Sequence, residues 1–181
     1  AEGDTVENGD RVAVLEAMKM EVSVPADRAG RVTWVGCRPG QLVTAGQPQR
    51  PQLLALRQQG FDAVVHIDAG QAANQVADEA ALVETQALQY VQIVVDAQAL
   101  TADDARTVAR TLDRLSDRRV LVHCEQNMLS STFVFLFRVL DRREDPRHAL
   151  DDVERLWVPH GKIREFLQIR LREQGIELDA I

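Results

Sequence analysis

Cys124 is the residue whose type and setting best suit covalent chemistry. It follows the apolar run Val120-Leu121-Val122 and His123, and a polar stretch leads from it into an apolar helical one. A helix N-terminus favours the nucleophilic thiolate form of a cysteine placed beside it. The plainer interpretation is a small core residue at the end of a buried strand, because unpaired cysteines are often buried.

Lys19 is the second candidate, in the string Glu16-Ala17-Met18-Lys19-Met20 within a stretch, 12–24, that reads as strand, tight turn and strand. The string resembles the biotin-attachment motif of biotin carboxyl carrier domains, as do the flanking segments 2–6 and 25–32. The resemblance implies covalent biotin on Lys19, with biotin ligase and carboxylase subunits as partners. The alternative is an ordinary exposed lysine in a hairpin.

An internal repeat frames this lysine. Segments 3–9 and 40–46 both read G-x-x-V-x-x-G, which implies two similar β units. The strands that such a symmetry requires are missing at both ends: one would precede Ala1, and 49–53 contains a proline and no alternation. We therefore expect residues 1–46 to be poorly packed or to lean on the rest of the chain, because open strand edges and a small core give little stability.

The setting of Cys124 resembles the protein-tyrosine and dual-specificity phosphatase superfamily, in a small bacterial branch. Segments 46–48, 60–67, 94–96, 155–157 and 165–167 extend the match. The resemblance implies phosphomonoester hydrolysis through a cysteinyl-phosphate, with Cys124 as nucleophile. Loop N–H groups and the helix N-terminus hold the phosphate. The implied partner is a phosphate-bearing small molecule or protein, and no cofactor is implied.

The loop departs from this family at the residue that grips phosphate. In the branch the loop reads H-C-x-x-N-x-R-x-S-x-F, which places Leu129 at the arginine position; under the broader C-x5-R spacing Ser130 stands there. A bidentate arginine contributes several kcal/mol in the transition state, so we expect impaired or lost activity, a pseudophosphatase. The candidate phosphate-binding loop consists of His123, Glu125, Gln126, Asn127, Met128, Leu129, Ser130 and Ser131.

A general acid must protonate the leaving oxygen. Asp96 follows the apolar strand 90–95 and, by the resemblance, stands on the general-acid loop. A loop or capping aspartate is the alternative. His66 lies within a strand and is expected to be a core or edge histidine, whereas His148 and His160 are isolated near helix starts. No set of His, Cys, Asp and Glu has metal-ligand spacing, so no metal site is expected.

Alternating strand-like and helix-like segments after residue 47 must position these side chains. We predict strands at 61–67, 90–95 and 120–122, and helices at 51–59, 76–87, 102–115, 132–141, 146–157 and 162–173. Thr101 and Asp104 have capping-box spacing, and the nearly all-apolar helix at 132–141 should be central. Short β-α-β units predict a parallel sheet. The predicted fold is α/β with flanking helices (47–181), preceded by an incomplete β segment (1–46).

The net charge and the cysteine content narrow the expected partners and cellular setting. The net charge of −7 disfavours nucleic-acid and anionic-membrane partners. The two cysteines, Cys37 and Cys124, lie in segments of different character and suggest no disulfide framework, so a reduced cytoplasmic setting is expected. Three hypotheses follow: a phosphatase-like domain with impaired activity, an active phosphatase using a substitute cation, and a biotin carrier module of a carboxylase.

Overall fold

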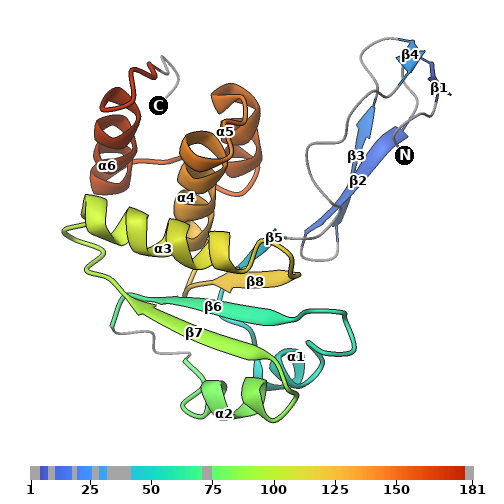
Figure 1. Ribbon diagram of the computed structural model, residues 1–181, viewed down its shortest axis with the longest axis vertical. Helices are drawn as coiled ribbons and strands as arrows, with labels where there is room; N and C mark the ends of the chain where they lie inside the picture. The colour runs from blue at the N-terminus through green and yellow to red at the C-terminus, as the bar shows by residue number, and fades with distance from the viewer. Residues whose placement is uncertain are drawn as a thin grey trace. The chain divides into compact units, whose positions relative to one another are not determined.

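The computed structural model describes residues 5–7, 11–17, 20–25, 29–31, 42–70 and 75–177. They belong to two compact units, Ala1–Pro39 and Gly40–Ile181. In the first unit β2 (Arg11–Ala17) pairs antiparallel with β3 (Met20–Pro25), which confirms the predicted hairpin (Figure 1). Two short strands, β1 (Thr5–Val6) and β4 (Gly30–Arg31), also pair antiparallel. Lys19 and Cys37 lie outside the described residues.

The second unit is built on a sheet of four parallel strands, in the order β5-β8-β6-β7. Their bounds are β5 (Leu42–Ala45), β6 (Ala63–Asp68), β7 (Gln89–Val94) and β8 (Val120–His123). The predicted parallel sheet is confirmed. The sequence did not reveal β5, because its residues form the second copy of the carrier-like repeat. This edge strand is why the two compact units divide at Pro39 rather than at residue 46, the boundary expected from the sequence.

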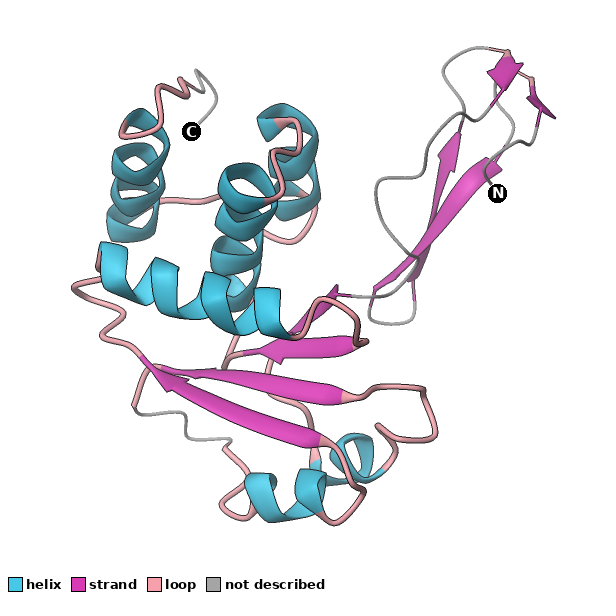
Figure 2. Ribbon diagram, in the orientation of Figure 1, coloured by secondary structure: helices cyan, strands magenta, loops and turns pink. Residues whose placement is uncertain are grey.

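Helices cover both faces of the sheet, as an α/β fold requires (Figures 1 and 2). On one face lie α1 (Arg50–Leu54) and α2 (Glu79–Glu84); on the other lie α3 (Ala102–Arg114), α4 (Met128–Leu136), α5 (Pro146–Glu154) and α6 (Gly161–Arg172). A π-helical turn, Phe137–Asp141, extends α4. Every residue from Leu129 to Leu136 is buried, which confirms the central position expected for this helix.

Several helices differ in length from the sequence expectation; α5, for example, ends at Glu154 rather than at residue 157. The helix α4 begins at Met128, directly after Asn127, so its first turn consists of loop-motif residues. The helix α2 ends at Glu84, and Ala87 has a φ of 59°, a left-handed conformation that cannot continue the helix. The helix α1 ends at Leu54 and passes into turns before Gly60. Hydrophobic spacing alone overestimated α1 and α2.

Alternation along the central strand separates two apolar cores. Val120, Val122 and Cys124 belong to the core beneath α3–α6, whereas Leu121 belongs to the core beneath α1 and α2. Successive side chains of a strand point to opposite faces of the sheet. The side chains of His123 and Cys124, at the end of β8, therefore point to opposite faces of the sheet.

The segment that carries Asp96 ends in the predicted capping box. Thr101 Oγ1 accepts a hydrogen bond from Asp104 N (3.2 Å), and Thr101 N donates to Asp104 Oδ2 (2.7 Å). Two otherwise unpaired N–H groups at the start of α3 are satisfied in this way. The cap fixes the point at which the loop after β7 becomes helix.

Replacing Thr101 by alanine should lower the free energy of unfolding by about 1 kcal/mol, because the cap hydrogen bond to Asp104 is lost. Urea denaturation followed by circular dichroism measures the change. Thr107→Ala, at an exposed position inside α3, is the matched control and should be neutral or slightly stabilising. Equal losses in both variants would contradict the assigned role of the cap.

Candidate functional site

Cys124 lies at the carboxyl end of β8 with its sulfur directed toward the first turn of α4. The side chain is 3% exposed. Ser130 N donates to Cys124 Sγ (3.5 Å), and Ser130 Oγ lies 3.4 Å from the same sulfur. A helix N–H and a hydroxyl group therefore both contact the sulfur, in the part of a helix that favours negative charge.

Asn127 turns the chain from the loop into α4. Its φ of 66° is left-handed, a conformation that asparagine adopts more readily than most residues. The side chain stabilises the turn, because Asn127 Oδ1 accepts from Ser130 Oγ (2.8 Å). Its carbonyl oxygen accepts from Ser131 Oγ (2.6 Å), and Ser131 Oγ in turn accepts from Trp157 Nε1 (3.0 Å).

The residues at and after the end of β5 hold the loop in place from the other side. Ala45 O accepts hydrogen bonds from Cys124 N (3.3 Å) and Ser130 Oγ (3.2 Å). Gln47 N donates to Glu125 O (3.1 Å). A Cβ atom on Gly46 would lie 3.2 Å from Glu125 O, so the close approach of the two backbones favours glycine here. The second glycine-framed repeat thus serves as the support of the Cys124 loop.

The two candidate arginine positions have different surroundings. Leu129 is 6% exposed and packs within the core beneath α3–α6. Ser130 is fully buried and makes the contacts to Cys124, Asn127 and Ala45 described above. Neither position supplies a cation. Of the remaining loop residues Glu125 and Gln126 are exposed, and Met128 is half-buried.

Asp96 is exposed in the loop that follows β7. Asp96 Oδ1 accepts from Gln98 N (2.8 Å), and Lys162 Nζ at the start of α6 donates to Gln98 O (2.9 Å). In the described part of the chain no hydrogen bond joins Asp96 to the Cys124 loop. Its role as general acid stays a prediction from the family resemblance.

A buried polar cluster lies on the opposite face of β8. His123 Nε2 is 2.6 Å from Glu79 Oε1, and Gln47 Nε2 donates to Glu79 Oε2 (2.7 Å). The His66 and His123 rings are stacked with centroids 4.5 Å apart, and His66 Nδ1 is 3.0 Å from the Tyr90 hydroxyl. Sequence reasoning did not find this cluster, because its members come from separate elements and share no local spacing.

Burial and charge shift the ionisation of this cluster. Burial, reinforced by neighbouring His123, lowers the pKa of His66 below its ordinary value. Burial alone would raise the pKa of Glu79, but the hydrogen bond and charge of His123 and the hydrogen bond from Gln47 lower it overall. Burial and the charges of Glu79 and Asp68 raise the pKa of Tyr90. The cluster therefore favours a neutral His66 and an ionised Glu79.

The protein should lose stability as pH falls below about 6.5, the ordinary pKa of histidine. The unfolded chain binds a proton at His66 in this range while the folded chain does not, so stability present above pH 6.5 is lost as pH approaches the lowered folded pKa. The groups that act on His66 are His123, Glu79 and Asp68. Urea unfolding between pH 7.5 and 5 measures the slope.

His66→Gln should flatten this dependence, whatever its effect on stability at pH 7.5. His148→Gln, an exposed histidine on α5, should leave the slope unchanged. Retention of the full slope in His66→Gln would assign the effect to another group.

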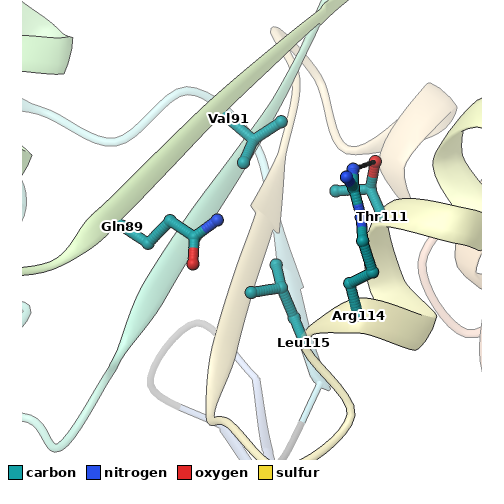
Figure 3. Close-up of a pocket in the computed structure, with 5 residues that line it drawn as sticks. All are labelled: Gln89, Val91, Thr111, Arg114 and Leu115. Atoms are coloured by element: carbon teal, nitrogen blue, oxygen red, sulfur yellow. Dashed lines mark hydrogen bonds between the residues drawn. The ribbon is translucent and has the colours of Figure 1, made fainter.

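A separate pocket of about 320 Å³ lies between β7 and α3 (Figure 3). It is lined by Gln89, Val91, Thr111, Arg114 and Leu115. Gln89 begins β7 and lies in register with the start of the parallel strands, whereas Cys124 follows the end of β8. The pocket is thus at the opposite end of the sheet from the cysteine loop.

Comparison with known proteins identifies relatives of the N-terminal segment. Residues 1–49 match the family model described as Biotin-requiring enzyme. A biotin/lipoyl attachment protein of Bacillus subtilis (strain 168) is 48% identical over 44 residues, which cover 24% of this chain and 60% of that protein. The alpha3 subunit of a biotin-dependent acyl-coenzyme A carboxylase of Mycobacterium leprae is 50% identical over 46 residues, or 25% of this chain and 8% of that subunit.

Solved structures resemble the second unit. A putative phosphatase (DUF442) of Shewanella putrefaciens has a TM-score of 0.65 at 24% identity, covering 75% of this chain and 87% of that one. Tk-PTP in its active form has a TM-score of 0.59 at 21% identity, covering 74% and 90%. A kinase-associated phosphatase with its catalytic cysteine changed to serine has a TM-score of 0.62 at 14% identity, covering 76% and 89%.

These comparisons bear out both resemblances seen in the sequence. The chain joins a biotin/lipoyl-type segment to a domain with a phosphatase-like α/β fold. None of the helices in the described ranges has the length and apolar character needed to cross a bilayer.

Proposed function

We propose that the domain around Cys124 is a phosphatase-like domain that binds phosphate groups but hydrolyses phosphomonoesters poorly. The observation that carries this proposal is the pairing of a formed cysteine loop with uncharged residues at both arginine positions. Ser130 contacts the cysteine sulfur and Leu129 lies in the core. The phosphatase-like fold of the domain supports the same function.

In the proposed reaction the Cys124 thiolate attacks phosphorus, an S–P bond forms and the P–O bond to the leaving group breaks. The leaving oxygen takes a proton from a general acid, for which Asp96 is the candidate. Water then gives a proton to the carboxylate left by the general acid and attacks phosphorus, the S–P bond breaks, and the thiolate departs with phosphate as the product. N–H groups of the loop and the start of α4 stabilise the phosphoryl oxygens. Without an arginine they do so alone, and the exposed Glu125 adds negative charge nearby.

Turnover of p-nitrophenyl phosphate should be low in the natural protein. If the guanidinium of Leu129→Arg leaves the core and reaches an intact loop, turnover should rise at least about tenfold, because a cationic donor on the phosphoryl oxygens contributes roughly 10²-fold or more when well placed. Leu129→Met, which conserves size and lacks charge, is the matched control and should not gain activity. Cys124→Ser should abolish any rate that depends on the thiolate. Circular dichroism establishes that each variant is folded.

A second variant tests the C-x5-R spacing, which places Ser130 at the arginine position. Ser130→Arg should not gain activity, because the substitution removes the hydroxyl group that contacts Cys124, Asn127 and Ala45 and so disrupts the loop. A gain in Ser130→Arg alone would assign the arginine position to Ser130. Ordinary turnover that depends on Cys124 in the natural protein would defeat the proposal of impaired chemistry and favour a substitute cation. Lys162, which contacts the loop of Asp96, would then be the first residue to replace.

A second function, biotin carriage on Lys19, is favoured by the family match over residues 1–49. The match to a biotin/lipoyl attachment protein supports it. The strands β2 and β3 also support it, because their pairing reaches Ala17 and Met20, the residues on either side of Met18-Lys19. A short turn between paired strands suits a cofactor carried on a long side chain.

Lys19→Arg should eliminate biotin labelling of the chain after co-expression with a biotin ligase, as detected by streptavidin blotting. The sequence contains two lysines, Lys19 and Lys162, so Lys162→Arg is a complete control and should keep the label. Absence of label on the unaltered chain, or its survival in Lys19→Arg, would reject this function.

A further inference from the structure

The buried cluster behind the cysteine loop has the composition of a metal centre. We propose that His66, Glu79 and His123 bind one divalent transition-metal ion, with Zn²⁺ the best chemical match. Their candidate ligand atoms all lie within 4.8 Å of one another, and the side chains are 1%, 3% and 0% exposed. Two imidazole nitrogens and one carboxylate oxygen are a donor set that suits zinc.

Two buried polar atoms of the cluster lack hydrogen-bond partners among the residues that the structure describes. His123 uses Nε2 toward Glu79, and its Nδ1 is one of the two. Gln47 donates through Nε2 to Glu79, and its Oε1 is the other. Buried unsatisfied polar atoms are rare in native proteins, and an ion or a water molecule often binds near those that occur. Neither atom is a ligand in the proposed centre, which uses His123 Nε2. They show that polar atoms around the Glu79 carboxylate have hydrogen-bonding capacity that the described residues leave unused.

Charge gives a second reason for a cation. The hydrogen-bond partners of the Glu79 carboxylate, among the described residues, are His123 and Gln47. Neither is a lysine or arginine, so without an ion the positive charge that offsets this buried carboxylate must come from a protonated His123. A divalent ion between the carboxylate and the imidazoles supplies that charge at the centre of the cluster.

Outer partners orient the proposed ligands. The Tyr90 hydroxyl lies 3.0 Å from His66 Nδ1, which leaves Nε2 as the nitrogen of that ring for the proposed ion. Gln47 Nε2 donates a hydrogen bond to Glu79 Oε2 (2.7 Å). Contacts of this kind fix the orientation of metal ligands. The ion replaces the proton shared by His123 Nε2 and Glu79 Oε1, now 2.6 Å apart, and that proton passes to solvent. Zinc bond lengths then require a separation of roughly 3.3 Å, a modest opening.

The site is distinct from the thiol chemistry. His123 and Cys124 face opposite sides of the sheet, so the ion would bind beneath α1 and α2 while the sulfur faces α4. The proposed site nevertheless includes His123, which directly precedes Cys124, and Gln47, whose backbone N–H donates a hydrogen bond to Glu125 O in the cysteine loop. The ion would stabilise the support of the loop without touching a phosphoryl group. The proposal therefore does not depend on hydrolysis.

The test is a Co²⁺ titration of the full chain with Cys37→Ser and Cys124→Ser, which removes both thiols as ligands. We expect visible d–d absorption that saturates at one ion per chain and is displaced by Zn²⁺. Glu79→Gln, which keeps the shape of the side chain, should weaken binding at least about tenfold, and Tyr90→Phe roughly tenfold. Glu154→Gln, an exposed glutamate on α5, should leave the affinity unchanged.

Three results would overturn the metal site. One is the lack of any saturable Co²⁺ or Zn²⁺ binding by the thiol-free chain at micromolar metal. Another is unchanged affinity in the folded Glu79→Gln or Tyr90→Phe variant, and the third is given by the His148→Gln control. Tyr90→Phe alters no proposed ligand, so it decides the question if Glu79→Gln does not fold. Loss of binding in His148→Gln, at the exposed histidine near Glu144, would place the ion on the surface instead.

Discussion

The parallel pairing of β8 between β5 and β6 is the constraint on which the candidate site depends. His123 lies in register with Ala45 on one side and with His66 on the other. The carbonyl oxygen of Ala45 then contacts both ends of the loop: it accepts a hydrogen bond from Cys124 N and shares the single Ser130 Oγ proton with Asn127 Oδ1. One backbone oxygen therefore fixes the distance between the end of the strand and the start of α4. The contact of Ser130 with the sulfur follows from that distance.

The same pairing organises the other face of the sheet. Because adjacent residues of a strand alternate between faces, the position after His123 must turn toward α4 when His123 turns toward α2. The stacking of His66 on His123 requires β6 to be the direct neighbour of β8. The pairing at the end of β8 thus positions both the cysteine loop on one face of the sheet and the buried histidine–glutamate cluster on the other. Neither arrangement survives a shift of register by one residue.

Local patterns in the sequence predicted most elements of this fold, and contacts between distant segments account for the rest. The strand before Cys124, the capping box at Thr101 and the apolar helix after the loop are each specified by neighbouring residues. The strand β5 was missed because its residues also satisfy a carrier-like repeat. The cluster around Glu79 was missed because one glutamate in a helical stretch carries no sign of the histidines that it meets. The burial of Leu129 likewise depends on tertiary packing rather than on the loop motif.

The lack of an arginine limits what the proposed phosphate site could do in physical terms. Backbone N–H groups and a helix N-terminus attract an anion in any state of the reaction. A bidentate guanidinium adds charge and a planar geometry that fit the transferring group. A loop that keeps the N–H groups and the helix N-terminus but lacks the guanidinium favours phosphate binding over turnover, because only interactions that strengthen in the transition state accelerate the chemical step.

The double membership of β5 has a practical consequence for dividing the chain. Residues 42–45 fall inside the segment that matches the biotin family, yet they form an edge of the parallel sheet. A cut after residue 46 would strip β8 of its neighbour and leave a row of open N–H and C=O groups beside the cysteine loop. Such an edge invites pairing with other molecules. An excised phosphatase-like fragment that begins at residue 47 would therefore be an aggregation-prone protein with a displaced loop, whereas a fragment that begins at Gly40 would keep β8 paired with β5.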